Sequence, residues 1–443
     1  MKYFAILKDS LRETLDSKVL YVLLGLSLLM ALFVATLSFK PLPAEKTLTQ
    51  VVDGRMAAVL EALKPEAQDK KDGDQGHEFP FNFRGSPYKL EKAVVLRGTP
   101  DSPDADYLMT LSKGFGDRQT AEKVHKNPAE EIDALRQHFA HLESFGYFRL
   151  EKMRVAGEAP TDASKVEFEM EFLPTRAMRR LWLHQPSLFF GLVPITRVEQ
   201  SLGFQLFFIA QLVMQMGSWL AVLLGVIITS FFIPNMLQKG SVDLLLVKPI
   251  RRPLLLVFKF VGGLTFILLV NAFAVVGIWF ALGLRSGLWA QWMLLLIPLL
   301  TFFFAILYSV STLVAVLTRS TVAAILVTIG VWLLFFSVGL AHELIEMEAR
   351  KEERAKLPPE ERVLSDHSAR WIVAGVHRVL PRTSDLNQLG ELLVFSDFVA
   401  GGYLSPKRIL SADRNWWESF GVSLAFIAIM LGLACWRFAR KDY

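Results

Sequence analysis

Long apolar runs alternate with polar, charged stretches along the chain. About six runs are long enough to cross a bilayer, which takes about 20 residues. The runs cover Val19–Phe39, Phe204–Ile233, Leu254–Leu282, a stretch that ends near Leu317, Thr321–Leu340 and Trp416–Trp436. The pattern therefore predicts an α-helical polytopic membrane protein with about six transmembrane helices.

A polar stretch, residues 40–201, separates the first two apolar runs and is large enough to form a small domain. Apolar residues at helical spacing predict helices over Asp53–Leu63 and Pro128–Phe145. Alternating apolar and polar residues predict strands over Tyr88–Arg97, Tyr147–Val155 and Ser164–Phe172. We therefore expect an inserted α+β domain.

The last of these strands has one apolar and one acidic face. Val166, Phe168, Met170 and Phe172 alternate with Glu167, Glu169 and Glu171. A row of carboxylates could hold a metal ion, but no histidine accompanies this row. We predict a half-buried strand whose acidic side faces water, and no metal site.

Basic residues at the ends of the apolar runs predict the topology. Met1–Ser17 reads as an amphipathic helix on the inner membrane surface, and Arg437, Arg440 and Lys441 follow the last run. Both termini are then cytoplasmic, and residues 40–201 and 342–415 are extracytoplasmic. The second insertion is also rich in Lys and Arg, and it would be cytoplasmic if the fifth run did not cross the membrane.

The predicted organisation divides the chain into five parts. They are residues 1–39 (amphipathic helix and first span), 40–201 (α+β domain), 202–341 (spans two to five, with an inner loop at 234–253), 342–415 (second extracytoplasmic segment) and 416–443 (last span and tail).

The loop between the second and third runs carries the most informative motif. Its basic residues are Lys239, Lys248, Arg251, Arg252 and Lys259, so the loop is expected to stay in the cytoplasm. Proline cannot donate a hydrogen bond inside a helix. A short amphipathic helix is therefore predicted to end near Lys248, before a membrane helix that starts near Pro253.

This loop resembles the cytoplasmic coupling segment of ABC-2-type (type V) ABC transporter permeases. The resemblance rests on Gly240, Ser241, Asp243, Leu244–Leu246, Pro249 and Arg252. The family often has Glu before the glycine, where this chain has Gln238 and Lys239. An ordinary basic loop between two helices is the alternative interpretation of the same residues.

The resemblance implies a membrane-spanning permease subunit that works as an exporter in the bacterial inner membrane. It implies a second permease subunit, in a homo- or heterodimer, and an ABC ATPase subunit that carries ATP and Mg. The residues expected to dock on that ATPase are Gly240, Asp243, Leu244, Lys248 and Arg252.

Catalytic sites are not expected in the chain itself. A phosphate-binding loop needs Gly-Lys, and no glycine is followed by lysine in this sequence. His342-Glu343-Leu344-Ile345-Glu346 has glutamate where a zinc protease helix has its second histidine. We expect no cofactor bound by this chain and no enzyme activity of its own.

Polar residues in the second run leave two interpretations open. Gln205, Gln211 and Gln215 lie at roughly helical spacing and form either a helix-packing face, which we favour, or a pathway face. Aromatic rings often sit at headgroup level, and we expect this of Trp182, of the Pro186/Phe189/Phe190 cluster, and of Trp289 and Trp292 at the outer interface.

Composition and charge argue against nucleic-acid binding and exclude an intrachain disulfide. The chain has 443 residues, 52% of them hydrophobic, and a net charge of +5. Its basic residues lie beside the apolar runs, so membrane lipids rather than nucleic acid are the expected contact. The one cysteine excludes an intrachain disulfide.

A second function is compatible with these features. The chain would then be a non-transporting membrane scaffold or anchor whose extracytoplasmic domain binds a partner or the cell envelope. The absence of mid-membrane carboxylates for an ion relay keeps this alternative open.

Overall fold

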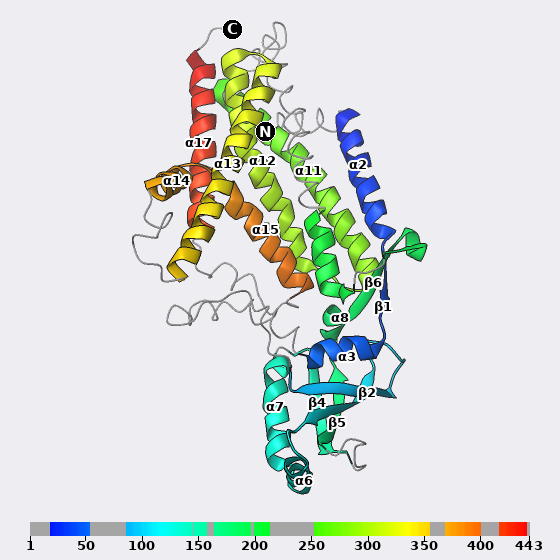
Figure 1. Cartoon of the computed structure of the whole chain (residues 1–443). Coiled ribbons are helices and arrows are strands. Elements are labelled where there is room, and N and C mark those ends of the chain that lie inside the picture. The colour runs from blue at the N-terminus through cyan, green and yellow to red at the C-terminus, as the bar shows by residue number, and fades with distance from the viewer. Residues whose placement is uncertain are drawn as a thin grey trace.

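The computed structural model describes residues 18–53, 86–144, 146–156, 164–195, 199–212, 252–354, 368–399 and 416–440. Within these residues, a bundle of long helices rests on a smaller unit that contains the β-sheets (Figure 1). We call the end of the bundle beside the sheets the sheet end. The opposite end is called the basic end because Lys18, Arg319, Arg437 and Arg440 lie there.

Long apolar helices form the bundle. They are α2 (Lys18–Ala35), α11 (Arg252–Ser286), α12 (Leu296–Thr318), which follows the 3₁₀ helix η2 (Gln291–Leu295), α13 (Thr321–Arg354) and α17 (Trp416–Arg440). In the part of the chain described here, five helices are long and apolar enough to cross a membrane. A shorter apolar helix, Leu202–Leu212, starts the predicted second span, whose remainder lies outside the described residues. The predicted fold class, a polytopic helical membrane protein with a sheet-containing insert, is confirmed.

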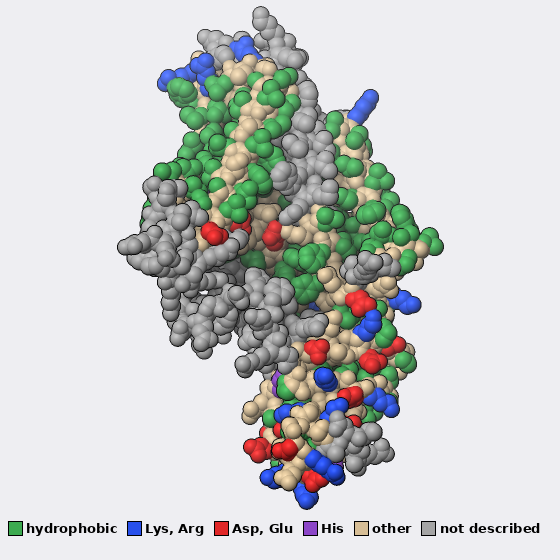
Figure 2. Space-filling model, in the orientation of Figure 1, with side chains coloured by type: hydrophobic (Ala, Val, Ile, Leu, Met, Phe, Trp, Pro, Cys, Tyr) green, Lys and Arg blue, Asp and Glu red, His purple; other side chains and the backbone are tan. Residues whose placement is uncertain are grey.

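Helix α12 lies at the centre of the bundle, where it contacts α11, α13 and α17. Its residues from Phe304 to Thr312 are buried without interruption. The other long helices keep apolar side chains on the outside, such as Leu29 of α2, Leu326 of α13 and Ile429 of α17. Figure 2 shows this apolar outer surface over the bundle, whereas charged side chains gather on the sheet unit and at the basic end. Such a surface suits a hydrocarbon solvent.

Helix α13 differs from the prediction. We expected the fifth span to end near Leu340. The structure has one helix of 34 residues, Thr321–Arg354. Neither glycine nor proline lies between Leu340 and Glu343, so nothing in the sequence interrupts the backbone hydrogen bonds there.

The segment after α13 also folds onto the bundle. It contains α14 (Ser368–Val379), which packs on α13, and α15 (Thr383–Phe398), which contacts η2, α12, α13 and α17. The buried side of α15 includes Leu386, Leu389 and Leu393. Their spacing places them on one helix face, a signal in the sequence that we did not use.

The larger sheet is antiparallel, with the strand order β2-β3-β5-β4. Its strands are β2 (Tyr88–Arg97), β3 (Asp106–Gly114), β4 (Phe148–Val155) and β5 (Lys165–Pro174). The accompanying helices are α3 (Ala44–Val52), α6 (Arg118–Lys126) and α7 (Ala129–Glu143).

Strands β2, β4 and β5 and helix α7 were predicted, and β3, α3 and α6 were not. Strand β3 follows a turn-rich stretch, yet its buried Tyr107, Met109 and Leu111 alternate as a strand requires. The helix predicted over Asp53–Leu63 lies outside the described residues from position 54 onward.

The two faces of β5 are as the alternation predicted. Val166, Phe168, Met170 and Phe172 are buried in the core of the unit. On the other face, Arg154 pairs with Glu169 at 2.7 Å and Lys152 with Glu171 at 2.9 Å across the neighbouring strand. Opposite charges therefore partner two carboxylates of the acidic row.

The prediction that Trp182 lies at the membrane interface is wrong. The Trp182 side chain is fully buried and stacks on Tyr107 with ring centroids 5.9 Å apart, rather than lying at a membrane interface. Its indole Nε1 donates to the carbonyl of Leu42 at 3.2 Å. An aromatic residue near an apolar run can thus belong to the core of an adjacent unit.

A second, small sheet joins the unit to the bundle. It contains β1 (Ser38–Pro41), β6 (Leu183–Leu188), β7 (Val193–Pro194) and β8 (Gln200–Ser201). Strand β1 directly follows α2, and β8 directly precedes the Leu202–Leu212 helix. The small sheet therefore holds together the ends of the first two predicted spans.

Gly203, next to this sheet, gives a test of the packing. A methyl group there would lie 2.3 Å from the carbonyl oxygen of Phe398 and 3.1 Å from that of Arg180. We expect Gly203→Ala to destabilise the protein by about 1–3 kcal/mol, because backbone atoms cannot move aside as side chains do. Thermal unfolding of the purified protein in detergent measures this.

Gly330→Ala is the matched control, since nothing lies within 4 Å of the added methyl group. It should leave the unfolding midpoint unchanged or slightly raised, because alanine favours a helix. Equal midpoints for the two variants would contradict the close contact at Gly203.

Candidate functional site

Most residues predicted to dock on a partner lie outside the described part of the chain. Gly240, Asp243, Leu244 and Lys248 fall within residues 213–251. Arg252 is the first residue of α11. Their docking role stays a prediction, and the described part of the candidate site is the helix that leaves the predicted docking loop.

Helix α11 is a long, continuous element. Its 35 residues correspond to about 50 Å of helix. It packs along α2, α12 and α17, so three neighbours fix its direction. A displacement at Arg252 would therefore be carried along one rigid helix rather than absorbed in a loop.

Close contact with α12 fixes the N-terminal half of α11. Phe260 stacks on Tyr308 of α12 with centroids 4.9 Å apart and an interplanar angle of 7°. One turn later, a methyl group on Gly263 would lie within 2.7 Å of the Tyr308 ring. The glycine lets the tyrosine ring lie directly against the α11 backbone, as small residues do between membrane helices.

Polar contacts accompany this packing. Asn271 of α11 donates from Nδ2 to the hydroxyl of Thr301 in α12 at 3.2 Å. Near the start of α11, the Cys435 thiol of α17 lies 3.6 Å from the carbonyl oxygen of Pro253. Interhelical hydrogen bonds of this kind add to helix association in an apolar solvent.

The other end of α11 is bonded to the small sheet. Arg285 donates from Nε to the carbonyl of Leu37 at 2.6 Å, just before β1. Gly287 has a positive φ of 72°, which allows the chain to leave the helix sharply. The same helix thus begins at the predicted docking loop and ends in contact with the sheets.

A second connection at the sheet end is made by the last turn of α15. The Asp397 carboxylate accepts from the backbone N–H groups of Trp292 at 2.6 Å and Met293 at 3.2 Å, at the start of η2. Its own carbonyl accepts from Arg180 Nε at 3.2 Å. Tyr147 of the sheet unit donates to the carbonyl of Val399 at 3.2 Å. We call the α15 clasp the group of residues that these bonds join, with Asp397 at the centre: Asp397, Trp292, Met293, Arg180, Tyr147 and Val399.

The electrostatics of the clasp follow from burial. Desolvation raises the pKa of Asp397 to about 6, although the two backbone N–H groups and Arg180 oppose the shift. Burial lowers the pKa of Arg180 from its usual value. α15 is not among the candidate membrane-spanning helices of the described residues.

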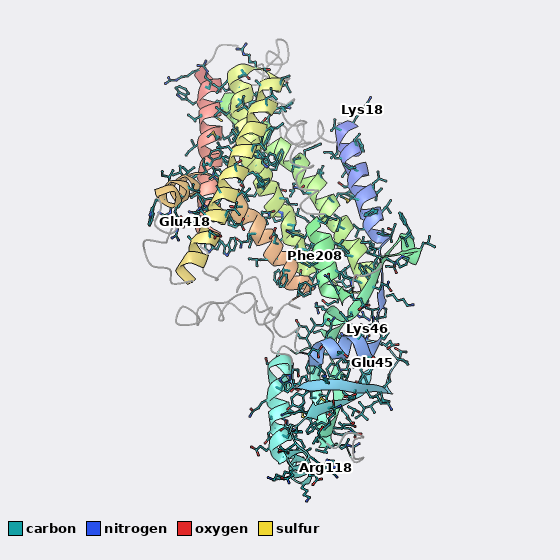
Figure 3. All side chains as sticks on the ribbon, viewed as in Figure 1. Lys18, Glu45, Lys46, Arg118, Phe208 and Glu418 are labelled. Carbon is teal, nitrogen blue, oxygen red and sulfur yellow. The ribbon has the colours of Figure 1, made fainter. Side chains whose placement is uncertain are left out.

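Contacts between α15 and α17 extend the connection. Arg382 pairs with Glu418, and the Ser419 hydroxyl donates to Asp385 at 2.5 Å. Figure 3 shows Glu418 at the end of α17 beside α15. None of these four groups was predicted as a site, because no motif marks polar pairs that form between distant helices.

The structure places Gln205 and Gln211 in different surroundings. Gln205 donates to the carbonyls of His184 at 2.5 Å and Gln200 at 2.8 Å, in the small sheet. Gln211 donates to Glu391 of α15 at 2.5 Å. Gln215 lies outside the described residues. Both described side chains contact neighbouring elements, and the choice between packing and pathway stays a prediction.

Metal ligands do not gather among the described side chains. No group of three or more His, Cys, Asp or Glu residues there could hold a metal ion. His342, from the sequence that partly resembles a zinc helix, stacks on His377 with centroids 4.1 Å apart. The described arrangement is therefore one of helix contacts and interhelix hydrogen bonds.

Comparison with known protein families gives a match. The model of a family described as ABC-2 family transporter protein matches residues 4–443. No curated protein and no solved structure shows significant similarity to the chain.

The clasp gives a pH prediction. Between pH 3.8 and about 6 the folded protein keeps the Asp397 proton that the unfolded chain loses. The free energy of unfolding should therefore fall as the pH rises through this range and then level off. Unfolding midpoints measured from pH 4 to 7.5 should show this slope, and Asp397→Asn should flatten it.

Asp133→Asn changes an exposed carboxyl of α7 and serves as the control. It should keep the slope of the natural protein. If Asp397→Asn kept the same slope as Asp133→Asn, the carboxyl of Asp397 would not be the group that titrates.

Proposed function

Because the chain belongs to the ABC-2 transporter family, we propose that it is the membrane-spanning subunit of an exporter driven by a separate ATPase subunit. Family membership supports a multi-pass ABC transporter permease, and such permeases in general work with a partner ATPase subunit. The direction of transport, the docking residues and the arrangement of subunits are parts of the proposal.

The proposed orientation puts the basic end in the cytoplasm of a bacterial inner membrane. Lys18, Arg319, Arg437 and Arg440 mark that end, and an excess of Lys and Arg is typical of the cytoplasmic side. Figure 3 shows Lys18 and Arg118 of the sheet unit at opposite ends of the molecule. In this orientation both termini are cytoplasmic and the sheet unit is extracytoplasmic.

The proposed mechanism rests on the continuity of helix α11. It starts at Arg252, which the resemblance assigns to ATPase docking, and its last turn bonds to Leu37 through Arg285. We infer that ATP and Mg, held by the ATPase subunit, drive a movement of the loop at residues 234–253. The rigid α11 transmits this movement to the sheet end.

Two states of the bundle are needed for such coupling. A dimer with a second permease subunit would enclose the transport path between the two copies, open to either side in turn. The alternative, a scaffold that does not transport, is not favoured by the family match.

Charge reversal at Asp243 tests the docking surface. We expect the natural protein, tagged and purified in mild detergent, to bring down an ATPase subunit, and Asp243→Lys to lose most of it. Opposite charge guides and holds such contacts. ATP hydrolysis by the purified complex should become uncoupled from transport in this variant.

Glu122→Lys provides the control, since it reverses an exposed charge on α6, in the sheet unit. It should retain the ATPase. If the ATPase copurifies equally with Asp243→Lys, the permease assignment stands and Asp243 is not a contact. If no ATPase copurifies with the natural protein and none responds to it, the scaffold alternative replaces the proposal.

A further inference from the structure

The turn between β6 and β7 is apolar and exposed. It contains η1 (Phe189–Gly191), followed by Leu192 and Val193. Phe189, Phe190, Leu192 and Val193 have exposed fractions of 49%, 68%, 82% and 49%. Four adjoining side chains of this kind are unusual on a surface that faces water. We call Phe189–Val193 the apolar tip.

Strand pairing sets the position of the apolar tip. Strand β1 leads away from the end of α2, and β6 pairs with it antiparallel, with Ser38 opposite Ser187. Strand β6 therefore runs back toward the bundle, and its turn comes level with the end of α2. The N–H of Phe190 donates to the carbonyl of Thr36 at 2.7 Å. Figure 1 shows this hairpin projecting sideways beside the lower end of α2.

The apolar tip continues the outer surface of α2. That helix has few buried residues, and its exposed side includes Leu28, Leu29, Leu32 and Phe33. Helix α2 is long and apolar enough to cross a membrane, and lipid is the solvent that suits its exposed apolar side. The tip begins where this lipid-facing surface ends, so the same solvent is expected to cover both.

The backbone presents the tip in a fixed form. Phe189 and Phe190 both have left-handed φ angles, 50° and 58°. Residues other than glycine adopt this conformation mainly where the surrounding structure imposes it. Here the imposed turn points two phenylalanine rings outward rather than into the core of the sheet unit.

A cation lies at the base of the tip. The Arg285 guanidinium is 5.3 Å from the centroid of the Phe190 ring. Its Nε also donates to the carbonyl of Leu37. Arginine beside aromatic rings is typical of the level of lipid headgroups, where the charge meets phosphate and the apolar parts meet acyl chains.

We propose that the apolar tip is inserted in the leaflet of the bilayer at the sheet end, with Phe190 and Leu192 among the acyl chains and Arg285 at the headgroups. The hairpin thereby fixes the height of the sheet unit above the membrane. This inference requires only that α2 spans a bilayer, and it does not depend on the ATPase partner or on the direction of transport.

Spin labels measure this insertion directly. The chain has one cysteine, so Cys435→Ser gives a background without thiols. Leu192→Cys is added and labelled with a nitroxide, and the protein is reconstituted in vesicles of phosphatidylcholine and phosphatidylglycerol. We expect high accessibility of the label to oxygen and an accessibility to a water-soluble nickel complex several-fold lower than that of an aqueous site.

Two labelled variants in the same background define the scale. Leu29→Cys lies on the exposed side of α2 and gives the value for lipid, and Arg118→Cys on α6 gives the value for water. The Leu192 side chain is 82% exposed, so the label should not disturb the core. Size-exclusion chromatography confirms that each variant keeps the natural elution profile.

Values at Leu192 that resemble those of Leu29→Cys support the proposal. Values that resemble those of Arg118→Cys overturn it, because the tip would then face water. An immobilised label with low accessibility to both reagents and spin–spin broadening also overturns it, because a second copy of the chain would then cover the tip.

Discussion

The structure depends on how closely α11 approaches its neighbours. Lipid is as apolar as the side chains, so burial alone does not hold membrane helices together. Close packing between the helices must therefore hold them together. Gly263 permits such packing, because it allows the Tyr308 ring to lie against the α11 backbone. Gly277 plays the same part toward Ala31 of α2, where a methyl group would lie 3.1 Å away. A helix packed this closely along its length can move only as a rigid body.

The sheet end combines several structural roles. There β1 continues α2, Arg285 joins α11 to β1, and the α15 clasp connects η2 with the sheet unit. The Arg285 bond and the α15 clasp each link elements that are far apart in the sequence. A change in the tilt of α11 would therefore change the position of the sheet unit, which gives a physical route between the two sides of the membrane.

Much of this fold follows from periodicity. Runs of about 20 apolar residues favour the lipid bilayer over water and are long enough to cross it. The strands of the insert alternate between apolar and polar residues because one face of the sheet is buried. The extent of α13 was missed because hydropathy marks where a helix leaves lipid and not where it ends. The clasp was missed because Asp397, Arg180 and Trp292 come together only in three dimensions. Trp182 was misplaced because the sequence does not say which apolar core a side chain joins.

The pairing of β1 with β6 also constrains the order of folding. The hydroxyl of Ser187 donates to the carbonyl of Ser38, 149 residues earlier in the chain. During synthesis α2 can insert into the membrane before β6 has been made. Strand β1 therefore remains unpaired until β6 is synthesised. The larger sheet, whose four strands all lie between β1 and β6, can form in this interval. Its formation brings the two ends of the intervening chain together and lowers the entropic cost of closing the loop. The small sheet can close only after β6 is made, and β1 and β8 then hold the end of α2 and the start of the Leu202–Leu212 helix in the same sheet.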